Sequence, residues 1–242
     1  MSALLEVRNV SRMFRSIRAV DGVSFGVEQG ELLGLIGPNG AGKSTLFNLV
    51  AGVLPPTSGD ILLDGLPVTG WKPHAMARAG VARTFQIPKP YRQLSVMENV
   101  MTSAFLHEKS MRGARELAEA TLAKVGLAAY RDIPANALTV GLLKRLEVAR
   151  ALATRPRLVL FDEIMAGLTP TEVGAMTEMV AELPARGITV IWVEHVLYAI
   201  MRTATRMVVI SRGKLIAEGT PASLARDPAV VKAYLGEETQ LA

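Results

Sequence analysis

The chain has 242 residues, half of them hydrophobic, and a formal net charge of +5 at pH 7. It contains no cysteine, which excludes disulfides and thiolate metal sites, and we find no apolar run near the ~18 residues that would cross a bilayer. The basic residues are scattered, with no run of five or more like charges, which favours ordinary solvated faces plus a phosphate site over a nucleic-acid surface.

At this length the chain fits one large α/β domain, and its first part predicts two strands. Residues 4–10 are expected to form an edge strand. Residues 19–27 alternate apolar and polar side chains, which indicates a half-exposed antiparallel strand. Between them, Phe14 is an isolated aromatic residue flanked by arginines. It is either a core anchor or a platform on which a purine base stacks, and the residues alone leave both interpretations open.

A glycine-rich segment then lies between a predicted strand and a predicted helix. Residues 31–36 form a short apolar run without polar alternation, as expected for a strand buried on both faces. Residues 44–51 indicate a helix that ends at Gly52. The segment between them fits G-x-x-x-x-G-K-[ST] and consists of Gly37, Pro38, Asn39, Gly40, Ala41, Gly42, Lys43, Ser44 and Thr45.

This strand–loop–helix order predicts a P-loop that binds a nucleoside triphosphate. Glycines allow backbone N–H groups to surround a phosphate, and the helix N-terminus adds partial positive charge. Lys43 is expected to reach the β- and γ-phosphates, and the Ser44 hydroxyl is expected to bind Mg²⁺.

The middle of the chain indicates helices inserted into the α/β domain. Residues 60–65 predict a short strand, and residues 80–86 form a β-like segment that ends at Gln86. Further on, Ser95 begins a helix with a capping box. We therefore expect a helical subdomain at about 87–152 and a core lobe at about 1–86 and 153–242.

Two apolar strands in the last third deliver polar residues at their ends. Residues 158–161 precede Asp162 and Glu163, and residues 188–193 precede Glu194 and His195. In open α/β sheets, ligands bind at the carboxyl ends of such strands. Two more strands are expected at 206–211 and 213–219, and the tail at 221–235 predicts two short helices.

The helix expected at 138–150 begins with Thr139 as a cap and has Gly141 near its start. With this helix, the order of P-loop, lone glutamine, strand ending in Asp-Glu and strand ending in histidine resembles the ATP-binding subunits of ABC transporters over essentially the full chain. Four short segments are similar in sequence to the branched-chain amino-acid importer ATPases, at residues 82–86, 145–150, 193–195 and 231–237. The resemblance implies a P-loop NTPase core of the ABC type, with an N-terminal antiparallel β-subdomain and the helical insert.

The resemblance also implies roles for single residues. Phe14 would stack on adenine, and Asp162 would hold Mg²⁺ through water. Glu163 would polarise or deprotonate the attacking water. His195 would contact the γ-phosphate, and Gln86 would sense Mg²⁺ or the water. From the residues alone, a histidine at a strand end such as His195 is more often structural, and Gln86 is also explained as an ordinary turn residue.

The signature that names the family is normally Leu-Ser-Gly-Gly-Gln, and this chain departs from it at residues 138–142. In the family, the signature binds the γ-phosphate of an ATP molecule that a second subunit holds. Thr139 keeps a hydroxyl and Gly141 keeps one point of close backbone approach, but Val140 replaces a glycine and Leu142 replaces the glutamine. Losing one hydrogen bond to a charged group would weaken the contact between subunits by about 1.5–3 kcal/mol. The loop after Glu163 departs as well, at Ile164 and Thr169.

The resemblance implies an ATP-binding and ATP-hydrolysing subunit of an importer of amino acids, branched-chain or similar small polar solutes. The expected partners are two membrane permease subunits, an identical or sister ATPase subunit, and indirectly an extracytoplasmic solute-binding protein, with no nucleic acid. The chain would lie peripherally on the cytoplasmic face of the inner membrane. Residues 86–99, including Tyr91 and Arg92, are either a docking groove for the permease or plain surface. A soluble ABC-type ATPase and an ATP-binding regulatory switch with weak hydrolysis remain alternatives.

Overall fold

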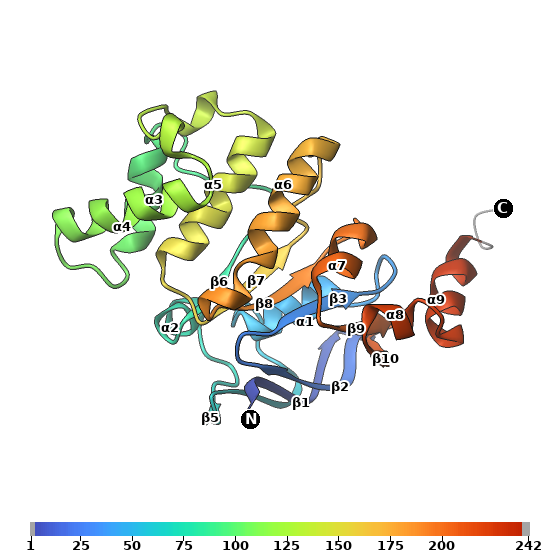
Figure 1. The fold of residues 1–242 in the computed structure, drawn as a ribbon. Helices are drawn as coiled ribbons and strands as arrows, with labels where there is room; N and C mark the ends of the chain where they lie inside the picture. The colour runs from blue at the N-terminus through green and yellow to red at the C-terminus, as the bar shows by residue number, and fades with distance from the viewer. Residues whose placement is uncertain (1–2, 239–242) are drawn as a thin grey trace.

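The computed structural model describes residues 3–238, which form two sheets and surrounding helices (Figure 1). The strand order is β2-β1-β4-β5 in a four-stranded antiparallel sheet and β10-β9-β3-β8-β7-β6 in a six-stranded mixed sheet. The predicted α/β class with an N-terminal antiparallel sheet is therefore confirmed.

The antiparallel sheet contains β1 (Ala3–Phe14), β2 (Ile17–Glu28), β4 (Ser58–Leu63) and β5 (Leu66–Pro67). Because β1 lies between β2 and β4, the prediction of an edge strand at residues 4–10 is wrong. Glu6 and Arg8 form an ion pair on this strand, although it is not at an edge. Its second partner, β4, is more distant in sequence, so local pattern gives no sign of this pairing.

The mixed sheet contains β3 (Leu32–Ile36), β6 (Val81–Arg83), β7 (Leu158–Asp162), β8 (Thr189–Val193), β9 (Arg206–Ser211) and β10 (Lys214–Gly219). Strands β6, β7, β8, β3 and β9 are parallel, and β10 is antiparallel to β9. Every residue of β3, β7 and β8 is buried, as the continuous apolar runs predict. The loops that follow β3, β6, β7 and β8 therefore leave the sheet at one edge.

The helices are α1 (Lys43–Val50), α2 (Pro73–Arg78), α3 (Val96–Ala104), α4 (Met111–Lys124), α5 (Val140–Ala153), α6 (Pro170–Ala181), α7 (Leu197–Thr203), α8 (Pro221–Leu224) and α9 (Pro228–Glu238). Ser95 begins α3 with the predicted capping box, and Thr139 caps α5. Sequence reasoning missed α2. This helix has six residues, one of them buried, and no capping side chain at Lys72.

Helices α3, α4 and α5 lie together at one end of the molecule, away from the antiparallel sheet (Figure 1). They fall within or next to the range predicted as helical, while the division into a core lobe and a helical subdomain stays a prediction. Within residues 3–238, no helix is both long enough and apolar enough to span a bilayer.

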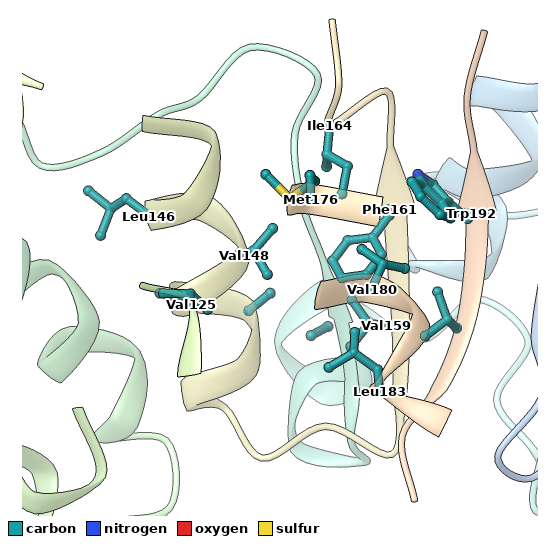
Figure 2. Close-up of a cluster of buried hydrophobic side chains, with 14 of the residues drawn as sticks. Val125, Leu146, Val148, Val159, Phe161, Ile164, Met176, Val180, Leu183 and Trp192 are labelled. Atoms are coloured by element: carbon teal, nitrogen blue, oxygen red, sulfur yellow. The ribbon is translucent and has the colours of Figure 1, made fainter. Parts of the chain in front are cut away.

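Strand β7 is fixed by packing on both of its faces. Val159 and Phe161 belong to a core cluster with Trp192 and with Met176 and Val180 of α6 (Figure 2). The alternate residues of β7 belong to a second cluster, which includes side chains of α1 and of the antiparallel sheet. Close packing on both faces leaves the end of this strand, where Asp162 and Glu163 lie, little freedom to shift.

Candidate functional site

The glycine-rich loop after β3 is packed tightly against neighbouring backbone. Gly37 has φ +153° and Gly42 has φ +106°, and a Cβ would lie 2.0 Å from the carbonyl oxygen of Ile210 at the first and 2.3 Å from that of Ala19 at the second. The carbonyl of Ala41 also accepts a 2.9 Å hydrogen bond from the N–H of Gly213. The loop thus needs glycine for space as well as for backbone conformation.

This packing gives a testable difference between two glycines of the same loop. Gly40 also has a left-handed φ, +73°, but a Cβ there meets nothing within 4 Å. Both alanine variants have backbone strain, while Gly42→Ala adds a clash with backbone. We expect Gly42→Ala to lower the free energy of unfolding by about 1–3 kcal/mol more than Gly40→Ala, measured by urea denaturation followed by circular dichroism. Equal losses would show that the loop moves away from Ala19 without cost.

The loop and the start of α1 form a pocket of about 200 Å³. Helix α1 has Gly42 at its N-cap and no capping side chain, so its N-terminus is not closed by a carboxylate or hydroxyl. The Lys43 ammonium donates to the carbonyls of Gly37 at 2.5 Å and Pro38 at 2.9 Å. The pocket is lined by Ala19, Asn39, Gly40, Ala41, Gly42, Lys43, Ser44, Thr45, Glu163 and His195. A basic, glycine-lined pocket at a helix N-terminus has the features of a phosphate site.

The three side chains predicted to handle the attacking water meet beside this pocket. Gln86 follows β6, Glu163 follows β7 and His195 follows β8. The Glu163 carboxylate accepts a 2.5 Å hydrogen bond from Nε2 of Gln86, and its other oxygen lies 2.8 Å from Nε2 of His195. Because the strands are parallel neighbours, their ends deliver these side chains to one place. The catalytic roles of the three residues stay predictions.

Asp162 lies next to this group and forms an ion pair with Arg83, a residue to which sequence reasoning gave no role. Its carboxylate accepts a 2.9 Å hydrogen bond from Arg83, and both side chains are largely buried. Arg83 also donates to the side-chain oxygen of Asn48 on α1, at 2.5 Å. Arg83 therefore balances the charge of Asp162, the carboxylate predicted to bind Mg²⁺, and connects β6 with β7 and α1.

The residues present fit a Mg²⁺ ion that is shared with a bound phosphate. Within the described part of the chain, no group of three or more His, Cys, Asp or Glu side chains could hold a metal. Mg²⁺ commonly takes one or two protein groups together with waters and substrate phosphates. Ser44 in the pocket and the Asp162 carboxylate are such groups, whereas the Gln86 amide is held on Glu163. The metal role predicted for these three residues is untested.

Two further charged residues lie behind the site, and sequence reasoning gave neither of them a role. Glu194 is buried, which raises the pKa of its carboxyl, and it accepts a 2.7 Å hydrogen bond from the N–H of Met165. Lys144 of α5 is also buried, which lowers the pKa of its ammonium group. The position of Glu194 at a strand end, directly before His195, did mark it as a polar residue near the site. Lys144 gives no such signal, because a lysine in a helix ordinarily indicates a solvated face.

The remaining predicted site residues lie outside the pocket lining. Phe14 is 41% exposed, with the Arg12 guanidinium 4.9 Å from its ring centre, so it is not a core anchor and stacking stays a prediction. Thr139 accepts a hydrogen bond from the N–H of Leu142. A Cβ on Gly141 would lie 2.1 Å from the Glu172 carboxylate of α6. The signature residues therefore stand at the N-terminus of α5, apart from the chain's own P-loop pocket.

Residues 20–166 match the family described as ABC transporter, and residues 214–239 match the family described as branched-chain amino acid ATP-binding cassette transporter. The high-affinity branched-chain amino acid transport ATP-binding protein BraF of Pseudomonas aeruginosa is 37% identical, over 97% of this chain and 98% of that protein. The corresponding protein LivG of Escherichia coli K12 is 35% identical over the same shares.

Two other likenesses bear on how general the fold is. The lipopolysaccharide export system ATP-binding protein LptB of Acidithiobacillus ferridurans is 35% identical over the full length of both chains. A crystal structure of an ATP-binding cassette of an ABC transporter in its ADP conformation is similar with a TM-score of 0.88 and 31% identity, covering 98% of this chain and 100% of that one.

Proposed function

This chain belongs to the ABC transporter family, and we propose that it is the ATP-binding and ATP-hydrolysing subunit of an ABC importer for branched-chain amino acids. The proposal that the chain hydrolyses ATP rests on one observation: the side chains of Gln86 and His195 contact the Glu163 carboxylate beside the P-loop pocket. The C-terminal match at residues 214–239 supports the substrate class. The likeness to an export ATPase over the full chain supports assigning the choice of substrate to the membrane partners and not to the cassette.

Each group of the site has a task in this proposal. The P-loop backbone and Lys43 hold the phosphates, and the contacts of the Lys43 ammonium group with the carbonyls of Gly37 and Pro38 fix it within the loop. Mg²⁺, held by Ser44 and Asp162, would neutralise charge on the phosphates. Glu163 acts as the general base. Gln86 and His195 each contact one of its two oxygens, and a carboxylate has about four acceptor positions, so the attacking water can bind while both contacts hold the base in place.

The proposed partners are two membrane permease subunits and a second ATPase subunit, with the chain peripheral to the cytoplasmic face of the inner membrane. An extracytoplasmic solute-binding protein would act indirectly. The docking surface, defined as residues 86–99, borders a cavity of about 220 Å³ lined in part by Phe85, Glu147 and Arg150. Ile87 and Tyr91 are exposed on this surface, and the Arg150 guanidinium lies 5.4 Å from the Tyr91 ring centre. Large exposed apolar side chains close together on one surface are typical of a protein interface.

The function is tested by isolating the tagged full-length protein from its host in a mild detergent. Two hydrophobic multi-span proteins, with or without a sister ATPase, are expected to co-purify. Ile87→Glu should reduce their recovery, whereas Leu66→Glu, a similarly exposed position on the antiparallel sheet, should not. Recovery of soluble partners or nucleic acid alone would contradict the importer while leaving the nucleotide site intact.

A further inference from the structure

Lys144 connects the helix that carries the signature to both loops that carry the predicted catalytic side chains. It lies on α5 and is 3% exposed. Its ammonium group donates to the backbone carbonyl of Gln86 at 2.5 Å and to that of Glu163 at 3.1 Å. One side chain thus joins α5 to the segment after β6 and to the segment after β7.

The backbone of Glu163 depends on contacts of this kind. Its φ of +48° lies in the left-handed region, which is unfavourable for a residue with a Cβ and persists where surrounding contacts fix it. Its N–H donates to the carbonyl of Val193 at 2.9 Å, and its own carbonyl accepts from Lys144. The contact to Val193 comes from the sheet, and the contact to Lys144 comes from the helical region.

The charges around Lys144 explain how an ammonium group is held in this buried place. Burial opposes its charge, while the carboxylates of Glu194, Glu163, Glu147 and Asp162 favour it. Glu194 and Glu147 are themselves tied to other groups, since Glu194 accepts from backbone N–H groups and Glu147 accepts from Arg150. The ammonium group is therefore surrounded by fixed acids and directed at two carbonyls.

We propose that Lys144 is a positioning residue that couples the N-terminus of α5 to the conformation of Glu163 and Gln86. Thr139 and Gly141 stand at that N-terminus, and five residues of helix span only about 7.5 Å. If a partner subunit displaced α5, the first turns of the helix would move as a rigid unit, and the Lys144 side chain would transmit that movement to the Glu163 carbonyl. This inference rests on the proposed ATPase function and assigns the residue through which the signature helix acts on the chain's own base.

The test uses the full-length protein with Lys144→Met, which keeps the length of the side chain and removes its charge and donors. Amide hydrogen exchange in peptides covering residues 84–92 and 162–169 is expected to accelerate about tenfold, because both segments lose a fixing contact. In ATP hydrolysis, kcat should fall about tenfold while KM for ATP stays within about twofold, since the P-loop contacts are unchanged. Lys144→Arg should restore much of the slow amide exchange and much of kcat, because arginine keeps the charge and the N–H donors. The matched control is Lys124→Met, which replaces an exposed lysine on α4 and should change neither the amide exchange nor the rate of ATP hydrolysis.

Unchanged exchange in both segments would overturn the proposal. Faster exchange spread evenly over the chain, in Lys144→Met and in the milder Lys144→Gln, would also overturn it and show a role in core stability instead. If the unmodified chain does not hydrolyse ATP even with its partners, the proposed function fails, while the exchange data on the apo protein still decide the role of Lys144.

Discussion

Replacing Glu163 by glutamine is expected to lower kcat for ATP hydrolysis by roughly 10²–10⁴-fold, the range that a positioned general base contributes. Glutamine has nearly the same shape but does not accept the proton of the attacking water. ATP binding should stay within about twofold of wild type, because the loop and Lys43 that hold the phosphates are untouched. The carboxylate also receives Gln86 and His195, so the amide at position 163 will alter this cluster as well.

The measurement is phosphate release at saturating ATP together with titration of a fluorescent nucleotide. Glu119→Gln, an exposed residue of α4, is the matched control and should leave both quantities unchanged. If wild type and Glu163→Gln show equal, near-zero rates even in the presence of the partner subunits, the regulatory switch is the better account of the chain. A large loss of nucleotide affinity in the variant would instead assign Glu163 to binding.

The strands that carry the site were predictable because their sequences are unambiguous. Strand β7 is apolar up to Asp162, and β8 is apolar after Thr189 and is followed by polar residues; a buried parallel strand is the simplest structure such a run can form. The convergence of Glu163 with Gln86 and His195 then follows from parallel pairing. The position of β1 was not predictable, because its pairing with β4 depends on contacts that are distant in sequence.

Arg83 and Lys144 could not be found from sequence for a different reason. Each is a charged residue in a segment whose local pattern indicates only strand or helix, and the meaning of its charge depends on groups from other elements. Arg83 meets Asp162 from β7 and Asn48 from α1. Lys144 meets carbonyls after β6 and β7. The resemblance to a family supplied roles for the motif residues, but these two buried contacts emerge only from the packed structure.

Restoring glutamine at position 142 is expected to strengthen ATP-dependent dimerisation by roughly 10–100-fold. This corresponds to about 1.5–3 kcal/mol for one hydrogen bond to a charged group. Leu142 is partly buried and packs against the core, so Leu142→Gln also loses some apolar contact within the chain. The gain therefore concerns association of subunits, while the variant itself should be slightly less stable.

The experiment uses analytical ultracentrifugation with ATP in a Glu163→Gln background, so that hydrolysis does not reverse association. Leu143→Gln is the matched control, because Leu143 is also partly buried against the same cluster but lies outside the signature positions. It should reproduce the loss of stability without the gain in dimerisation. If the unmodified signature already dimerises as tightly as Leu142→Gln, the hydroxyl of Thr139 and the close approach at Gly141 suffice for the contact. The departures at Val140 and Leu142 would then not weaken dimerisation, and a weak rate of hydrolysis would need another cause, such as the loop that begins at Ile164.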